Sequence, residues 1–248
     1  FGTSAFNGAI NIVTKKAPNN GVAALVEGGS FGSFGAQGRA QTAFTTGKWE
    51  HAYSVSGGYK RSDGGTENSD FEKGQGYGQF SFSYDKRFDI GAQVGIATQS
   101  YGANTFYSAK YNNQYEKTDH GLASLNLSLH DVAHTWEVTP TFYYNKFKDH
   151  YQLIRGKAGA AAGENYHNLD VWGGSLNANI SWFLGKTAVG FDISKERIYS
   201  TALGEALAED KYKDISGSDR QYTKKGERTN TNIMLEHNFI FGGFTLSA

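Results

Sequence analysis

Apolar and polar side chains alternate at every second residue over long stretches of this chain. In VWGGSLNANISWFL, Trp172, Leu176 and Ile180 share one face, and Ser, Asn and Gly occupy the other. The segments 48–60, 88–99 and 121–130 repeat this pattern. A period of two is typical of a β-strand whose two faces meet different surroundings. The pattern therefore predicts an all-β protein, and no comparably strong amphipathic helix is expected.

About ten strands and the start of another are predicted. Their approximate ranges are 21–31, 36–46, 48–60, 76–85, 88–99, 121–130, 135–149, 169–183, 187–199 and 228–240, with a further strand from 244. Beyond the first connection, tight turns at 46–48, 85–87, 131–134, 184–186 and 241–243 alternate with long connections at about 61–75, 100–120, 150–168 and 200–227. Short turns at one end and long loops at the other are typical of a transmembrane antiparallel β-barrel.

The spacing of aromatic residues agrees with this interpretation. Trp172 and Trp182 lie ten residues apart on one face, and Trp49 and Tyr59 repeat the spacing. Ten residues span roughly 33 Å along a strand, or roughly 25 Å after a tilt of about 40°, which is the height of an outer-membrane apolar band. Lys195 and Arg197 continue an apolar face, so we expect them at the outer rim. A large soluble β-sandwich, with these tryptophans in its core, is the alternative.

Composition excludes several classes of protein. The chain has 24 Lys plus Arg, 24 Asp plus Glu and no Cys. A balanced charge disfavours a dedicated nucleic-acid binder, and the absence of Cys excludes disulfide scaffolds and thiolate metal sites. No nucleophile elbow or paired-carboxylate site is apparent, so an enzyme is not expected. The Gly-rich segment 28–35 precedes no helix and therefore predicts no nucleotide site.

The first residues, FGTSAFNGAINIVTKK, resemble the end of the plug domain in TonB-dependent outer-membrane transporters. The residues that carry the resemblance are Gly2, Gly8, Ile10, Asn11, Ile12 and Thr14. The resemblance implies that 1–18 ends a plug domain and that 19–248 form the N-terminal half of a barrel of 22 strands. We expect the chain to be a fragment, because it begins partway through this motif.

Further stretches, among them FYYNKFKDHYQLIRG and ENYHNLDVWGGSLNANISWFLGKTAVGFDI, resemble the cobalamin-transporter branch of this family. The resemblance implies a bacterial outer-membrane receptor that imports cobalamin or another corrinoid. It also implies a partner, the TonB energy-coupling complex of the inner membrane. A ferric siderophore or haem receptor is the alternative within the family. A passive porin and an outer-membrane hydrolase are alternatives outside it; a porin has no N-terminal plug.

Aromatic residues gather in one predicted outer loop. They are Tyr101, Phe106, Tyr107, Tyr111 and Tyr115. Rings in such a loop are suited to stack on a flat ligand such as a corrin, with about 1 kcal/mol for each contact. The alternative is that they pack the loop against the rim or the plug.

Two other loops offer weaker candidate sites. Asp63, Glu67 and Asp70 supply oxygen atoms for a structural calcium ion, although their spacing differs from that of an EF-hand, and a solvated acidic loop is the alternative. The segment 204–228 has mixed charge, is expected to be exposed and mobile, and is a candidate contact for a surface lipoprotein. The seven His residues show no metal-ligand spacing, although haem ligation by one loop His stays open, and His167 is expected to make a loop hydrogen bond.

Overall fold

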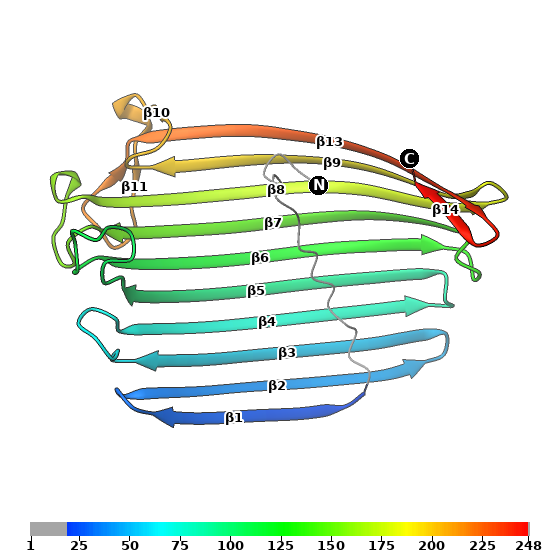
Figure 1. The fold of residues 1–248 in the computed structure, drawn as a ribbon, viewed down its shortest axis with the longest axis horizontal. Helices are drawn as coiled ribbons and strands as arrows, with labels where there is room; N and C mark the ends of the chain where they lie inside the picture. Colours follow the sequence, from blue (N-terminus) through cyan, green and yellow to red (C-terminus); the bar gives the residue numbers. More distant parts are fainter. Residues whose placement is uncertain (1–18, 248) are drawn as a thin grey trace.

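The computed structural model describes residues 19–247, which form one large antiparallel sheet consistent with a fragment of a β-barrel wall (Figure 1). Its principal strands are β1 (Gly21–Gly29), β2 (Ser33–Thr46), β3 (Trp49–Ser62), β4 (Phe71–Tyr84), β5 (Phe88–Gly102), β6 (Tyr115–His130), β7 (Trp136–Gln152), β8 (Glu164–Trp182), β9 (Gly185–Ser200), β13 (Lys224–Phe241) and β14 (Phe244–Ser247). Each strand pairs with the next in chain order. The prediction of an all-β protein with a large antiparallel sheet is therefore confirmed.

The connections differ in length between the two ends of the sheet. Residues 47–48, 85–87, 131–135, 183–184 and 242–243 make the short turns at the right of Figure 1. Residues 63–70, 103–114, 153–163 and 201–223 make the long loops at the left, which we call the loop end. Gly47 has a φ of 61°, a conformation that glycine adopts at little cost in a two-residue turn. The predicted alternation of short and long connections is confirmed.

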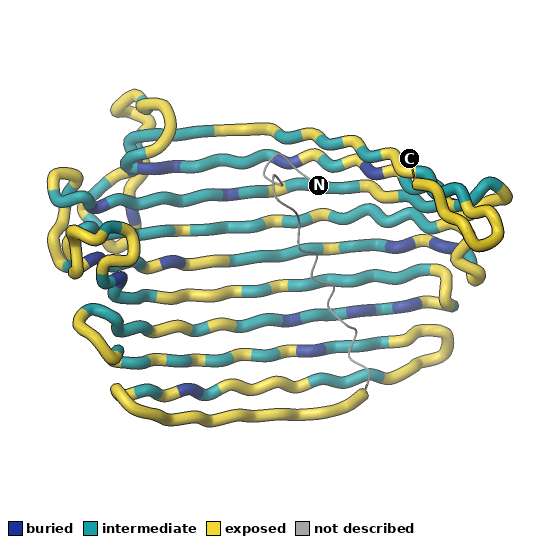
Figure 2. The backbone as a smooth tube through the Cα atoms, viewed as in Figure 1, coloured by how far each residue is buried: buried dark blue, intermediate teal, exposed yellow. Residues whose placement is uncertain are grey.

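The two faces of the sheet have opposite chemistry, and the polar face is the more buried one. The apolar face carries exposed large hydrophobic side chains, namely Val55, Val94, Ile96, Leu125, Phe142, Leu176, Phe191, Ile193, Ile233 and Leu235. The polar face carries buried Ser54, Ser81, Ser83, Thr118, Ser128 and Ser194. Figure 2 shows exposed and partly buried residues along β2 to β9 and β13, whereas β1 is exposed throughout. This distribution is the reverse of that in a water-soluble protein, which buries its large apolar side chains.

No second layer of strands covers the apolar face within residues 19–247, because each long strand contacts only its neighbours in the sheet. All four tryptophans of the chain lie on this face. Trp49, Trp136 and Trp182 lie at the turn end, whereas Trp172 pairs with Tyr144 toward the loop end. The arrangement is compatible with a membrane β-barrel and differs from a two-sheet sandwich with tryptophans in its core.

Several strands continue further toward the loop end than the alternating pattern predicted. β6 begins at Tyr115 rather than near residue 121, and β8 begins at Glu164 rather than near 169. The added residues, such as Glu116–Thr118, are polar on both faces, so they show no alternation although their ladder hydrogen bonds continue. Lys195 pairs across from Trp172, and Arg197 pairs with Asp170, two residues further toward the loop end.

The last long loop, residues 201–223, is folded rather than simply extended into solvent. It contains β10 (Glu205–Ala206), a 3-10 turn at Glu209–Lys211, β11 (Lys213–Asp214) and β12 (Gln221–Tyr222). Ile215 and Tyr222 are buried against Tyr199 of β9. The expectation of an exposed, mobile segment missed this small core, because its apolar residues are scattered among charged ones. A further 3-10 turn spans Ala160–Ala162, and within residues 19–247 no helix has the length and apolarity needed to cross a membrane.

Candidate substrate-binding site at the loop end

A cluster of aromatic and carboxyl side chains lies on the polar face at the loop end. It consists of Tyr101 from β5, Tyr107 from the 103–114 loop, Glu116 from β6, Asp149 and Tyr151 from β7, and His167 from β8, and we call it the mouth cluster. The strand register places these residues together, since Tyr101 pairs with Glu116 and Glu116 with Tyr151. Residues far apart in sequence therefore meet at one position of the sheet.

Glu116 is the centre of the mouth cluster. The hydroxyls of Tyr101 and Tyr107 lie 3.0 Å apart, and both donate hydrogen bonds to Glu116 Oε2. The Tyr107 ring meets the Tyr151 ring edge-on at 5.4 Å. Burial raises the pKa of Tyr101, and the Glu116 carboxylate raises it further. Both tyrosines are therefore held as neutral hydrogen-bond donors with fixed rings.

Asp149 lies beside Glu116 with only 14% of its side chain exposed. Burial raises the pKa of Asp149 to about 7, and the negative charge of Glu116 adds to the effect. One of its oxygens, Oδ1, is buried without a hydrogen-bond partner. Near neutral pH the neutral form of Asp149 is therefore favoured over its ordinary ionised form, because burial and the neighbouring Glu116 carboxylate both oppose ionisation.

Ser200, His167 and Asp149 lie in a row that superficially resembles a hydrolase triad. His167 Nδ1 lies 2.8 Å from Ser200 Oγ, and Nε2 lies 3.9 Å from Asp149 Oδ2. Ser200 is completely buried, however, and its Oγ accepts hydrogen bonds from the N–H groups of Ala202 and Leu203 at 2.8 and 2.7 Å. These contacts close the turn after β9 and leave the hydroxyl inaccessible to a substrate.

The loops around the mouth cluster are hydrogen-bonded to one another. Gln114 is fully buried, donates to the carbonyls of Ser108 and Tyr111, and accepts from the Tyr151 hydroxyl at 2.9 Å. Asn68 of the 63–70 loop donates to the Gln114 carbonyl at 2.6 Å. The 103–114 loop is therefore fixed from inside and from its neighbour.

Arg155 connects a third loop, residues 153–163, to the 63–70 loop. Its guanidinium forms a two-pronged ion pair with Asp70, at 2.6 and 2.9 Å, and a further hydrogen bond to Asn68 at 3.0 Å. The hydrogen bonds from Arg155 lower the pKa of the Asp70 carboxyl. Such paired contacts fix orientation as well as distance. The three loops 63–70, 103–114 and 153–163 therefore form one connected rim.

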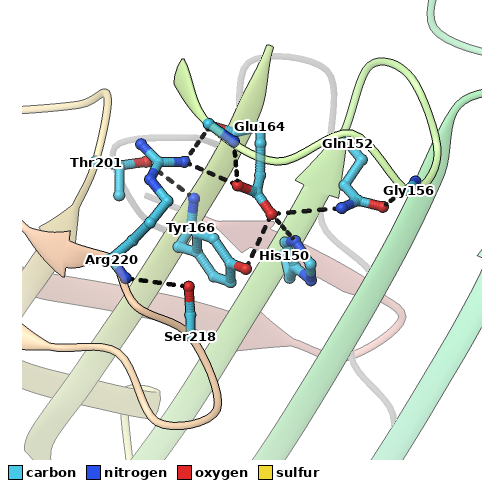
Figure 3. Close-up of polar contacts among 9 residues, drawn as sticks. His150, Gln152, Gly156, Glu164, Tyr166, Thr201, Ser218 and Arg220 are labelled. Carbon is cyan, nitrogen blue, oxygen red and sulfur yellow. Dashed lines mark hydrogen bonds and ion pairs between the residues drawn. The ribbon is translucent and has the colours of Figure 1, made fainter. Parts of the chain in front are cut away.

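Glu164, at the start of β8, joins the fourth loop to this rim (Figure 3). The residue is 3% exposed, and its carboxylate accepts from the Gly159 N–H at 2.7 Å, the Tyr166 hydroxyl at 3.0 Å and Arg220 at 3.3 Å. His150 Nε2 lies 2.8 Å away. Burial opposes ionisation, but the hydrogen bonds, led by that from Gly159, outweigh it and bring the pKa down to about 2.

The structure brings together some of the predicted aromatic residues and separates others. Tyr101 and Tyr107 belong to the mouth cluster, and Phe106, 76% exposed, meets the Tyr107 ring edge-on at 4.8 Å. Tyr111 lies exposed in the loop. Tyr115 points to the opposite face, where the Arg155 guanidinium lies 4.9 Å from its ring. A pocket of about 520 Å³ beside Tyr101 and Phe106 is bounded by Thr66 and Ser69 of the neighbouring loop.

Sequence reasoning missed Glu116, Asp149 and Tyr151 and described His167 only as a loop residue. His167 lies in β8 rather than in a loop, and its predicted hydrogen bond is the contact with Ser200. The sequence held one signal for this group. In each strand every second residue lies on the same face, and this rule continues past the point where the apolar and polar residues stop alternating. That signal requires the register between strands, which the sequence does not supply.

The other predicted positions have separate surroundings. Asp63 pairs with Arg61 at 2.9 Å, and Asp70 pairs with Arg155, so two of the three proposed calcium ligands already face cations. In the described part of the chain no group of three or more His, Asp or Glu residues is arranged to hold a metal ion, and the calcium site including Glu67 stays a prediction. The plug-like residues Gly2, Gly8, Ile10, Asn11, Ile12 and Thr14 lie outside the described residues.

The arrangement suits the binding of a large ligand with a flat, partly polar surface. It offers exposed and half-exposed rings, tyrosine hydroxyls in fixed positions and a carboxyl pair on a common support. Searches of protein-family models, curated proteins and solved structures find no match to this chain.

Proposed function

We propose that this chain forms part of an outer-membrane transporter that imports a large, scarce nutrient. One observation carries the proposal: the sheet exposes its large apolar side chains on one face and buries small polar ones on the other. Lipid is the surrounding that makes such a face favourable, since alternate residues of an outer-membrane strand meet hydrocarbon. The loop end is then the outer surface of the cell, and the short turns face the periplasm.

The apolar face has the height that a bilayer requires. Between Trp172 and Trp182 on β8 the intervening residues of this face are Gly174, Leu176, Ala178 and Ile180. Charged residues on this face, such as Lys195 and Arg197, lie at or beyond the Trp172 level. A cation near the interface costs far less than one at the bilayer midplane. The distribution of charge along the strands supports the membrane placement.

Closure of the sheet is part of the proposal. Within residues 19–247, β1 has a strand neighbour on one side only, and its residues are exposed throughout. An unpaired strand edge in lipid would leave backbone N–H and C=O groups unsatisfied, at several kcal/mol for each group. Further strands of the whole protein therefore close the wall, and we propose a barrel of 22 strands. A barrel of that size needs a plug, which the Gly2–Lys15 stretch resembles.

Cobalamin or another corrinoid is the substrate that we propose. The mouth cluster and Phe106 present aromatic rings beside fixed hydroxyls, which suits a wide, flat ring system with polar substituents. The residues that resemble the cobalamin branch support the same choice. Ferric siderophore and haem are the alternatives. Transport would draw its energy from the TonB complex of the inner membrane, and a surface lipoprotein on the 201–223 loop is a further proposed partner.

Uptake in the native bacterium tests the proposal. Deletion of the gene should abolish growth on limiting corrinoid and leave growth on haem or ferric siderophore unchanged. Restoring the full-length protein with Tyr101→Ala and Tyr107→Ala should give weaker corrinoid binding at the cell surface, whereas Tyr84→Ala, at the turn end of β4, should not. Loss of haem uptake with intact corrinoid uptake would overturn the choice of substrate. Recovery of the protein in the soluble fraction would overturn the membrane placement.

A further inference from the structure

A groove with basic side chains lies on the polar face of β1 to β4, the face that also carries the mouth cluster. Its volume is about 250 Å³, and its polar lining includes Gln37 of β2, Lys60 of β3, and Lys73 and Gln75 of β4. The strand register places these four side chains on one face, in two adjacent rows. We call this feature the basic groove, and nothing in the function proposed above accounts for it.

The two lysines of the basic groove are direct cross-strand partners, Lys60 on β3 and Lys73 on β4. Side chains in this position have Cβ atoms about 4.5–5.5 Å apart, and like charges directly opposite each other destabilise a sheet. Glu27 of β1 reaches Lys60 Nζ at 2.7 Å by crossing over Gly35, where a Cβ atom would lie 2.8 Å from the Glu27 side chain. Lys73 makes no ion pair in the described part of the chain. One positive charge of the lysine pair is therefore left without a counter-charge.

Arg39 of β2 adds a further positive charge on the same face. Its guanidinium donates a hydrogen bond to Ser54 Oγ at 3.3 Å, and within residues 19–247 it makes no ion pair. On this face β1 to β4 carry two carboxylates, Glu27 and Glu50, and Glu50 lies at the turn end as the second residue of β3. Away from the turn end, three cations on these strands therefore face one carboxylate, and the charge favours an anionic occupant.

The basic groove is continuous with the mouth cluster along the sheet. Phe71 of β4 pairs across from Tyr101, and Lys73 follows Phe71 by two residues on the same face. Diagonal neighbours of this kind lie about 7–8 Å apart. Both groups are near the loop end, because Lys60 and Lys73 are each two residues from the end of their strands on that side. A ligand whose ring system lies against Tyr101 would therefore have an appended group within reach of Lys73.

We propose that the basic groove binds an anionic oxygen group, a phosphodiester or a carboxylate, that is appended to the transported ligand. The inference rests on the proposed import function, but not on the choice between corrinoid and haem. Lysine attracts such a group as a point charge and needs no fixed geometry, and the amides of Gln37 and Gln75 supply neutral donors beside it. The groove would thus select, among flat ring systems that fit the mouth cluster, those that carry an anionic arm.

Equilibrium binding of two matched ligand pairs to the full-length protein in detergent tests the inference. One pair is cobalamin and cobinamide, which lacks the phosphodiester arm; the other is haem and its dimethyl ester, which lacks the free carboxylates. We expect Lys73→Gln to weaken binding of the anionic member about threefold at low salt, which is within the range for an exposed charge pair. Binding of the neutral member should not change. Lys73→Arg, which keeps the charge, should retain the binding of both, and Lys186→Gln, on the same face at the turn end, should do the same.

Salt supplies an independent measurement, because at about 1 M the screening length falls to about 3 Å and the difference between wild type and Lys73→Gln should disappear. Arg39→Gln should act in the same direction and keeps the test decisive if Lys73→Gln does not fold. Equal losses for both members of a pair would overturn the inference and leave the import function intact. Unchanged binding with a lower melting temperature of the ligand-free protein would also overturn it, since the groove would then be filled by the protein itself. A selective loss in the haem pair alone would support the inference and remove the corrinoid assignment, whereas binding of neither pair would overturn both proposals.

Discussion

Two neighbouring residues near the middle of β8 allow a direct test of which face meets lipid. Leu176 is 47% exposed on the apolar face, where it pairs across from Phe191. Asn177, the next residue, lies on the polar face across from Gly190. Replacing each by Arg adds the same side chain at almost the same height, but on opposite sides of the sheet.

The expected magnitude follows from the position of Leu176. It lies four residues from Trp172 and six from Trp182, or roughly 13 Å and 20 Å along the strand. Leu176 is therefore close to the middle of the apolar band. An Arg at the midplane of a bilayer costs about 2–4 kcal/mol, whereas a residue facing a water-filled interior tolerates the change within about 0.5 kcal/mol.

The assay is urea unfolding of the full-length protein refolded into lipid vesicles. We expect Leu176→Arg to lower the free energy of unfolding by about 2–4 kcal/mol and Asn177→Arg to leave it nearly unchanged. Vesicles with brominated acyl chains supply a second measurement, because bromine in the hydrocarbon quenches the tryptophans of the apolar face. A larger loss for Asn177→Arg, or no quenching, would refute the assignment of the two faces.

Three further predictions concern the loop end. Glu164 has a pKa of about 2 against an ordinary 4.5, so its contribution of about 3 kcal/mol is present above pH 4.5 and is lost as the pH falls toward 2. Glu164→Gln should accordingly speed amide exchange at Gly159 at neutral pH, whereas Glu209→Gln in the exposed loop should not. The pKa of Asp149 is raised from 3.8 to about 7, so native-state stability should fall as the pH rises through this interval. Asp149→Asn should then raise the melting temperature at pH 8 more than at pH 4, and an equal effect at both would contradict the assignment. Arg155→Gln removes the two-pronged ion pair with the 63–70 loop, and limited proteolysis should cut that loop faster by roughly fivefold, corresponding to about 1 kcal/mol.

The part of each strand with one apolar and one polar face was predictable, and the part beyond it was not. Between Trp172 and Trp182 the two faces meet different surroundings, so the sequence must alternate and the pattern is visible. Beyond that band the side of β8 that carries Trp172 becomes polar, with Asp170 and Asn168, so the alternation is lost although the backbone ladder continues to Glu164. The short turns were predictable because Gly or charged residues within them interrupt the apolar periodicity.

The sequence predicted aromatic residues for the candidate site, but not the carboxyl groups that lie among them. Tyr101 and Tyr107, two of the predicted aromatic residues, meet at Glu116, a contact that the sequence did not predict. Tyr115 immediately precedes Glu116, and for that reason its side chain points to the other face of β6. Asp149 comes from the next strand, and only the register between β6 and β7 places it there. Sequence proximity was thus a poor guide to which side chains share a surface.

The length of β8 has a consequence for how a nutrient would first meet the protein. From Trp172 to Glu164 the strand runs eight residues past the interfacial aromatic level, which is roughly 26 Å along its axis. In a tilted wall this amounts to a vestibule standing roughly 20 Å above the bilayer. Under the proposed membrane placement, capture would begin above the lipid, and a cargo molecule would be enclosed on its sides before it reached the depth of the bilayer.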